Sequence, residues 1–382
     1  MDKKRIIILG ASGSIGRSTL SVLKNLSQEG WAFEVVGMSC RSKVDELLNS
    51  AAEFNVPNLA ATAPKGSTDQ LKWTGEDAVI QLLEHTECDI VVNGIAGSRG
   101  LEPSMKVLEL GIDLALANKE TVVMAGPQAF KLARRNNASI IPVDSEHSAI
   151  FHLLEKRDRD TLRRIIITAS GGAFRTTPLE EFSSLGLKDA LRHPTWDMGA
   201  KITVDSASMA NKGLEVIEAH RLFALAPEKI SVTVHPQSCV HSFVETLDGS
   251  LYAQLSAPDM RIPIQNALTY PDIWESPFGA LSFEDLTLTF SSPDYRRYPM
   301  LALAYETIRT EGVLPIVYNA ANEVAVEAFI TGEIPFTAIA EVVEAALSGN
   351  WPDSPETVEG VMEIHRRAEE RTRTIISKRK VT

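Results

Sequence analysis

The chain has 382 residues, of which 44% are hydrophobic and 23% are charged, and its formal net charge at pH 7 is -12. These values exclude a largely disordered chain and fit a globular protein of two or three domains. The negative charge argues against nucleic acid or an anionic membrane as the main partner, although a local basic pocket can still bind an anionic small molecule. Three separated cysteines indicate neither a disulfide framework nor a paired-cysteine metal motif. The first apolar run is too short for a signal peptide or a membrane span, so we expect a cytoplasmic protein.

Short apolar runs alternate with amphipathic stretches along the first third of the chain. We expect strands at residues 5–10, 33–38, 89–94, 113–118 and 139–144, with helices between them. Runs of Val, Ile and Leu that are separated by helices are typical of a parallel sheet covered on both faces. Ligands of such sheets bind beyond the carboxyl ends of the strands.

The middle of the chain shows a different pattern. Strands are expected at 163–172, 230–236, 241–250 and 251–258, and the Asp248-Gly249 pair between the last two predicts a hairpin. We therefore predict an α/β protein with an N-terminal Rossmann-like domain and a central α+β domain, followed by a C-terminal helical bundle. The predicted segments are 1–144, 145–270 with a lid loop at about 170–200, a linker at 271–298, and 299–382.

A glycine-rich turn follows the first predicted strand. Gly10, Gly13 and Gly16 allow the backbone to approach a pyrophosphate at the start of a helix. The second strand ends without the carboxylate that marks NAD binding, and Arg41 and Lys43 stand there instead, which favours NADP. Alternatively, the glycines merely let a helix pack on a strand.

Two carboxylates, Asp144 and Glu146, follow the strand at 139–144. On an extended segment, residues two positions apart point to the same side, so the pair can converge on a hard cation such as Mg²⁺ or Mn²⁺. A helix cap is the alternative interpretation. Glu215 is a candidate third ligand, although spacing alone does not distinguish it from a surface glutamate.

Polar groups that suit a phosphate are dense between residues 168 and 213. Lys212 is either a phosphate ligand or a plain surface lysine, and Trp196 belongs either to a lid over the substrate or to a buried loop anchor. The candidate phosphate-binding residues are Ser170, His193, Ser206, Asn211 and Lys212.

Several motifs together resemble the 1-deoxy-D-xylulose 5-phosphate reductoisomerase family: GASGSIG, PVDSEHSAIF, TASGGAF, HPTWDMGAKITVDSASMANKGLEVIEAHRLF and VHPQSCVHSFVE. They occur in the family's order along nearly the whole chain. The resemblance implies a rearrangement of 1-deoxy-D-xylulose 5-phosphate and its reduction by NADPH to 2-C-methyl-D-erythritol 4-phosphate, in the methylerythritol phosphate route of isoprenoid biosynthesis. It implies a divalent metal (Mg²⁺ or Mn²⁺, with Co²⁺ as a further option). It also implies a homodimer that pairs through the central sheet.

The resemblance also assigns roles to individual residues. The metal ligands are Asp144, Glu146 and Glu215, and these residues are catalytic together with Lys119, His193 and Trp196. Substrate contacts are expected from Lys119, Ser145, Glu146, Ser170, His193, Met198, Ser206, Asn211, Lys212, Glu215 and Met260, with His241 behind them. Cofactor contacts are expected from Gly10, Ala11, Ser12, Gly13, Ser14, Ile15, Gly16, Gly37, Arg41, Ser42, Lys43, Asn93, Gly94, Asn118, Glu120 and Gly199.

One stretch departs from the family pattern. After the second strand the family usually has a small residue, and Asn two positions later, whereas this chain has Arg41 and Lys43. The departure puts the detailed adenosine contacts in question and strengthens the electrostatic case for a 2′-phosphate.

Two other functions stay open from the residues alone. A simple NADP-dependent dehydrogenase with structural carboxylates would be insensitive to chelators. A catalytically silent nucleotide-binding regulator would bind NADPH without substrate-linked oxidation.

Overall fold

The computed structural model describes residues 3–196 and 198–379 and divides into two units, each built from separate stretches of chain. The first unit comprises residues 1–121, 129–151 and 259–280, and the second comprises 122–128, 152–258 and 281–382. None of the helices in the described ranges is long and apolar enough to cross a membrane.

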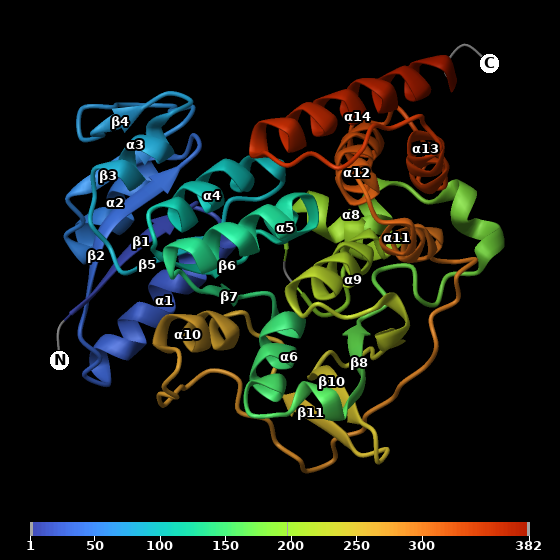
Figure 1. Cartoon of the computed structure of the whole chain (residues 1–382), viewed down its shortest axis with the longest axis horizontal. Coiled ribbons are helices and arrows are strands. Elements are labelled where there is room, and N and C mark those ends of the chain that lie inside the picture. The colour runs from blue at the N-terminus through green and yellow to red at the C-terminus, as the bar shows by residue number, and fades with distance from the viewer. Residues whose placement is uncertain (1–2, 197, 380–382) are drawn as a thin grey trace. The chain divides into compact units, whose positions relative to one another are not determined.

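The first unit is built on a seven-stranded sheet whose neighbouring strands are all parallel (Figure 1). The strand order is β4-β3-β2-β1-β5-β6-β7. All five strands predicted in the first third are confirmed, whereas the short β3 and β4 have no clear apolar run and were not predicted. The strands are β1 (Lys4–Leu9), β2 (Phe33–Cys40), β3 (Asn58–Ala61), β4 (Trp73–Thr74), β5 (Ile90–Asn93), β6 (Asp113–Leu116) and β7 (Ile140–Pro142).

Successive residues of a strand point to opposite faces of the sheet, so the apolar side chains of these strands need helices on both faces. Ile6 and Ile8 of β1 join one core cluster with α1 (Ser14–Gln28), α2 (Val44–Phe54) and α10 (Arg261–Thr269). Ile7 faces the other way, toward Gly37. The other helices of this part of the chain are α3 (Ala78–Glu84), α4 (Leu101–Glu109), α5 (Lys119–Asn136) and α6 (Ser145–Glu155).

The second unit contains a mixed four-stranded sheet of order β11-β10-β8-β9. The strands are β8 (Leu162–Ala169), β9 (Ile230–Val234), β10 (Val240–Thr246) and β11 (Leu251–Leu255). β8 and β9 are parallel, whereas β10 is antiparallel to both β8 and β11. The predicted hairpin is confirmed: Gly249 adopts a φ of +86°, and Asp248 Oδ1 accepts hydrogen bonds from Thr246 Oγ1 (2.6 Å) and Ser250 N (3.0 Å).

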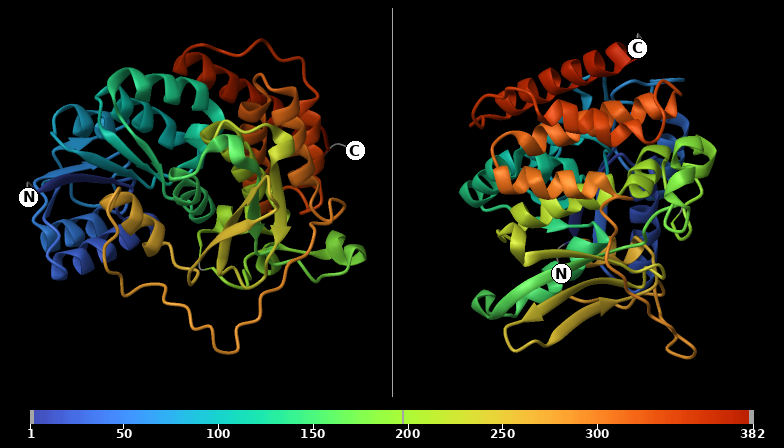
Figure 2. Two further views of the ribbon diagram at one scale, coloured as in Figure 1. Left: turned by 60° about the horizontal axis from the view of Figure 1, so that its bottom comes forward. Right: turned by 90° about the vertical axis from the view of Figure 1, so that its right-hand side faces the viewer.

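Further helices lie in the second unit. They are α7 (Leu187–Ala190), α8 (Ala200–Ser208), α9 (Ala210–Leu222), α11 (Pro299–Thr310), α12 (Leu314–Ile330), α13 (Ala338–Leu347) and α14 (Val358–Arg379). The last four confirm the expected helical C-terminal segment. Figure 2 shows the chain running without helix between α10 and α11, as its many prolines predict.

Helix α5 is interrupted near its middle, where the sequence contains a proline. Ala125 has non-helical dihedrals, and Pro127 has no N–H to donate to the carbonyl of Val123, four residues earlier. The Arg221 side chain of α9 donates to that carbonyl (2.6 Å) and to the carbonyl of Val122 (3.1 Å). The half-buried Arg221 side chain therefore replaces the missing helical hydrogen bond.

Candidate active site

The turn between β1 and α1 can exist only with glycine at certain positions. A Cβ atom on Gly16 would lie 2.4 Å from the backbone of Ala11, and one on Gly10, whose φ is +77°, would lie 3.0 Å from the carbonyl oxygen of Gly94. Gly13 is the N-cap of α1 and makes no side-chain cap, so the first amides of the helix face outward without a competing side chain. Such a turn suits a pyrophosphate.

The end of β2 is basic in the structure as well as in the sequence. Arg41 and Lys43 are exposed beside half-buried Ser42. Lys43 Nζ pairs with Glu46 (2.7 Å), which also lies 3.6 Å from Arg17. A phosphate at this edge would therefore meet a cluster of cations that one carboxylate partly neutralises.

Two buried asparagines, Asn93 at the end of β5 and Asn118 at the N-cap of α5, organise the loop beyond β5. Asn93 Nδ2 donates to the carbonyl of Gly100 (2.9 Å), and its Oδ1 accepts from Ile95 N (3.1 Å). Asn118 Nδ2 donates to the carbonyls of Ile95 and Gly97 (both 2.8 Å), while its Oδ1 caps α5 through Thr121 N (3.0 Å). The side-chain amides thus hold loop 94–100. Glu120 is close enough to accept from Asn118 Nδ2 (3.1 Å).

The acidic pair Asp144 and Glu146 lies where β7 leads into α6. The expected extended geometry is wrong here: β7 ends at Pro142 and α6 begins at Ser145, so Glu146 belongs to the first turn of a helix. One carboxylate oxygen of Asp144 and one of Glu146 nevertheless lie within 4.8 Å of each other. The Asp144 carbonyl accepts the first helical hydrogen bond, from Ser148 N (2.8 Å), and Ser145 Oγ donates to the Glu146 carboxylate (2.6 Å); neither contact is a side-chain cap.

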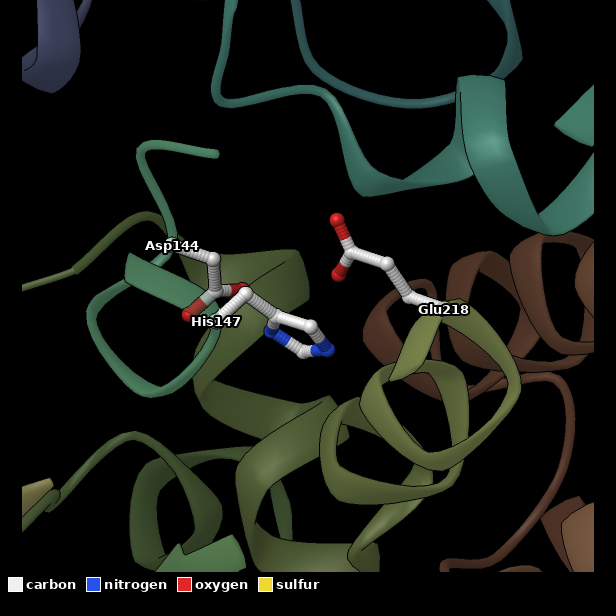
Figure 3. Close-up of side chains that lie close together, drawn as sticks. All are labelled: Asp144, His147 and Glu218. Carbon is white, nitrogen blue, oxygen red and sulfur yellow. The ribbon is translucent and has the colours of Figure 1, made fainter. Parts of the chain in front are cut away.

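Lys119, the first residue of α5, forms a close ion pair with Asp144. Burial by itself raises the pKa of Asp144, but the charges of Lys119 and His147 and a hydrogen bond with Glu146 outweigh it, and the pKa stays well below its usual range. Figure 3 shows Asp144 and His147 at this turn; Glu218, drawn with them, is a residue of α9 in the second unit. Asp144 is therefore an ionised, acceptor-only group at the carboxyl edge of the parallel sheet.

His193 is the centre of a polar cluster in the second unit. Its Nε2 lies 3.0 Å from Ser170 Oγ and 3.1 Å from Ser206 Oγ. Its Nδ1 accepts hydrogen bonds from the amides of Thr195 (3.2 Å) and Trp196 (2.9 Å), so the ring proton resides on Nε2. Burial, with the nearby charge of Arg175, lowers the pKa of His193 to about 4, and the ring is neutral at pH 7.

Helix α9 carries the remaining candidates of the second unit. Glu215 is buried, accepts a hydrogen bond from Asn211 Nδ2 (2.7 Å) and forms a close ion pair with Lys212, which is also buried. Lys212 is thus not the surface lysine of the alternative interpretation. A phosphate at this position would share the ammonium of Lys212 with Glu215.

The remaining candidate residues lie on the predicted lid, at the start of α10 and in β10. Trp196 and Met198 are half-buried, Gly199 caps α8 at an exposed position, and Asp197 of the predicted lid lies outside the described residues. Met260 packs against the core cluster of the first unit at the start of α10. His241 is buried in β10, and its Nε2 lies 2.9 Å from Ser256 Oγ.

Sequence reasoning missed the side chains that hold the Gly171-Gly172 turn beside Ser170. Arg175 donates to the carbonyl of Ser170 (2.8 Å), and the Tyr298 hydroxyl donates to the carbonyl of Gly171 (2.8 Å). Tyr298 lies more than 120 residues away in the sequence, at the end of the predicted linker, and no local pattern marks it. Arg175 directly follows the motif TASGGAF, and this position was the one sequence signal that could have identified it as a partner of the turn.

Three family models match most of the chain. Residues 6–126 match 1-deoxy-D-xylulose 5-phosphate reductoisomerase, residues 140–223 match its C-terminal domain, and residues 255–371 match the DXP reductoisomerase C-terminal domain. A curated protein from Treponema denticola named 1-deoxy-D-xylulose 5-phosphate reductoisomerase is 47% identical over 370 residues, which cover 96% of each chain. One of the same name from Chlorobaculum tepidum is 43% identical over 384 residues, covering 98% of this chain and 100% of that one.

Solved structures agree with these sequence matches. The 1-deoxy-D-xylulose 5-phosphate reductoisomerase of Zymomonas mobilis in complex with NADPH superposes with a TM-score of 0.90 at 39% identity, covering 98% of this chain and 99% of that chain. A DOX-P reductoisomerase in complex with NADPH, fosmidomycin and magnesium gives a TM-score of 0.90 at 33% identity, with 99% of both chains covered. The chain therefore belongs to the 1-deoxy-D-xylulose 5-phosphate reductoisomerase family.

Proposed function

We propose that this protein converts 1-deoxy-D-xylulose 5-phosphate to 2-C-methyl-D-erythritol 4-phosphate, with NADPH as the reductant and a divalent metal as the second cofactor, as a step of the methylerythritol phosphate pathway. Family membership supports the reaction. The observation that carries the proposal to this chain's own residues is the convergence of Asp144 and Glu146 beside Lys119.

The carboxylate donors suit a hard cation. Mg²⁺ and Mn²⁺ prefer oxygen ligands and are usually held by a few carboxylates together with substrate oxygens. Asp144 and Glu146 would supply two of these ligands, and Glu215, buried and ionically paired on α9, would supply the third. The bound ion would polarise the ketone and hydroxyl oxygens of the substrate.

The first unit has the features that an NADPH molecule requires. Gly10, Gly13 and Gly16 permit the tight turn at the start of α1 whose backbone amides would bind a pyrophosphate, and Arg41 and Lys43 suit the 2′-phosphate that distinguishes NADPH from NADH. NADPH would supply the hydride for the aldehyde formed by the rearrangement.

The second unit has the features that a phosphomonoester requires. His193 offers a neutral Nε2–H donor beside the hydroxyls of Ser170 and Ser206. Asn211 and Lys212 lie on helix α9. These residues would hold the phosphate, the end of the substrate that does not react, so that binding energy there orients the reacting carbons. Trp196, fixed to His193 through its amide, would cover the substrate and exclude water.

Lys119 has a separate role in this proposal. Its ammonium neutralises Asp144 and stands at the same edge as Ser145. It would bind the substrate hydroxyls and keep a positive charge near the oxygen that becomes negative during the rearrangement.

A spectrophotometric assay tests the function. With Mg²⁺, addition of 1-deoxy-D-xylulose 5-phosphate should start NADPH oxidation, and excess EDTA should stop it. Glu215→Gln should lower kcat by at least a hundredfold and leave NADPH binding unchanged, whereas Glu228→Gln, an exposed residue of the same unit, should behave like the wild type. Oxidation that persists in EDTA would favour a simple dehydrogenase, and its absence under all conditions would refute the proposed reaction.

A further inference from the structure

A second group of metal-ligating side chains lies in the C-terminal helices, far in sequence from the acidic pair. Glu323 belongs to α12, and His365 and Glu369 are one helical turn apart on α14, so both face the same way. The two helices pack side by side within the second unit (Figure 1). Each of the three residues offers one ligand atom, and the three atoms lie within 4.8 Å of one another.

The distances suit an ion between the side chains better than hydrogen bonds. His365 Nε2 lies 3.8 Å from Glu323 Oε2 and 3.5 Å from Glu369 Oε1, longer than the roughly 2.7–3.2 Å of a normal N–H···O bond. Ligand atoms about 2.0–2.1 Å from a tetrahedral Zn²⁺ are about 3.3 Å apart. Small side-chain rotations would therefore bring all three atoms into the coordination range.

Burial favours binding through the imidazole. The His365 side chain is 6% exposed, compared with 15% for Glu323 and 25% for Glu369, so the ring is fixed in the interior and an ion can enter from the side of Glu369. Its Nδ1 is buried and has no hydrogen-bond partner in the described part of the chain. The imidazole is thus not engaged in a competing side-chain network through that nitrogen.

Groups around the cluster would orient the carboxylates. Asn319, fully buried one turn before Glu323, places Nδ2 3.5 Å from Glu323 Oε1 and leaves Oε2 toward His365. Arg373 contacts Glu369 Oε2 at 3.4 Å and leaves Oε1 toward His365. At 3.5 and 3.4 Å both contacts are longer than normal hydrogen bonds, so they favour these carboxylate orientations without fixing them.

We propose that Glu323, His365 and Glu369 form a second divalent-metal site, separate from the catalytic one, that takes a borderline cation such as Zn²⁺. One imidazole and two carboxylates match the ligand preference of Zn²⁺, with water at the fourth position. The ion would join α12 to α14 and stabilise the helical segment.

Zinc titration of the full-length, chelator-treated protein tests the site. To keep the catalytic carboxylates from contributing, all variants carry Glu215→Gln and are measured in excess Mg²⁺ by competition with a chromophoric zinc chelator. The parent should bind one equivalent of Zn²⁺, and Zn²⁺ should raise its thermal midpoint. His365→Gln should lose that equivalent and the shift of the midpoint.

Glu369→Gln gives a second reading if His365→Gln fails to fold, and it should weaken Zn²⁺ binding at least tenfold. Glu327→Gln, an exposed glutamate one turn further along α12, is the matched control and should bind like the parent. Absence of zinc binding in the parent, or equal binding by the parent and both ligand variants, would overturn the proposal.

Discussion

Gly16 is a residue at which the nucleotide turn tolerates no side chain, because the backbone of Ala11 occupies the space of a Cβ atom at 2.4 Å. Gly16→Ala should therefore displace the turn and weaken NADPH binding by at least tenfold, as measured by fluorescence titration. Gly186→Ala is the control, since a Cβ there meets only Asp189 Oδ2 at 3.9 Å. Unchanged NADPH affinity in Gly16→Ala would show that the cofactor does not depend on this turn.

His193 should make the protein sensitive to acid. Its pKa is lowered to about 4 in the folded protein by burial, whereas the unfolded chain protonates it near its ordinary value of 6.5. Because the unfolded state then binds the proton and the folded state does not, stability is full above pH 6.5 and falls as the pH drops from there toward 4.

Urea unfolding at pH 7.5 and pH 5.0 measures this contribution. The stability difference between the two pH values should be smaller in His193→Gln than in the wild type. His85→Gln removes an exposed imidazole instead and serves as the control. An equal pH effect in wild type and His193→Gln would contradict the lowered pKa of this half-buried ring.

At this scale the geometry of the candidate site could not be predicted from the sequence. Asp144 and Glu146 were expected to converge because of alternation along a strand, yet they converge across a strand-to-helix turn. Lys212 and Glu215 were weighed one by one, whereas the structure pairs them in the interior. Spacing alone carries no information on burial, and burial decides which charges must find partners.

Among the elements, helix α5 is interrupted at a point where the side chain of Arg221 supplies hydrogen bonds to its backbone. Arg221→Met would leave the carbonyls of Val122 and Val123 buried and without their donor. Each unsatisfied carbonyl costs roughly 1–3 kcal/mol, so we expect the free energy of unfolding to fall by about 2 kcal/mol or more. Denaturant titration would show this, and Arg221→Lys should recover part of the loss. A neutral effect of Arg221→Met would mean that the broken helix needs no external donor.

Strand β11 is an edge of the four-stranded sheet and carries exposed apolar side chains. Leu251 and Tyr252 are 56% and 41% exposed. An apolar edge strand is a natural place for pairing with a second copy, as the family resemblance predicted. Light scattering should give a dimer for the wild type and a larger monomer fraction for Leu251→Asp, whereas a monomeric wild type would contradict the prediction.

For the whole molecule, most of the order of strands and helices was predictable because apolar periodicity is local, although β3 and β4 were missed. The way in which these elements group into two units was less predictable. Residues 259–280 belong to the first unit because α10 packs against α1 and the core around Ile6. Nothing in the local sequence of α10 indicates this long-range partner. The proposed function follows from the family resemblance, because a nucleotide turn and scattered carboxylates fit several reactions.

Product analysis tests the central claim most directly. The protein, incubated with Mg²⁺, NADPH and 1-deoxy-D-xylulose 5-phosphate, should consume one NADPH for each branched polyol phosphate formed. Carbon NMR should identify that product as 2-C-methyl-D-erythritol 4-phosphate. An unbranched, merely reduced sugar phosphate would contradict the proposed rearrangement, as would NADPH consumption without a phosphorylated product.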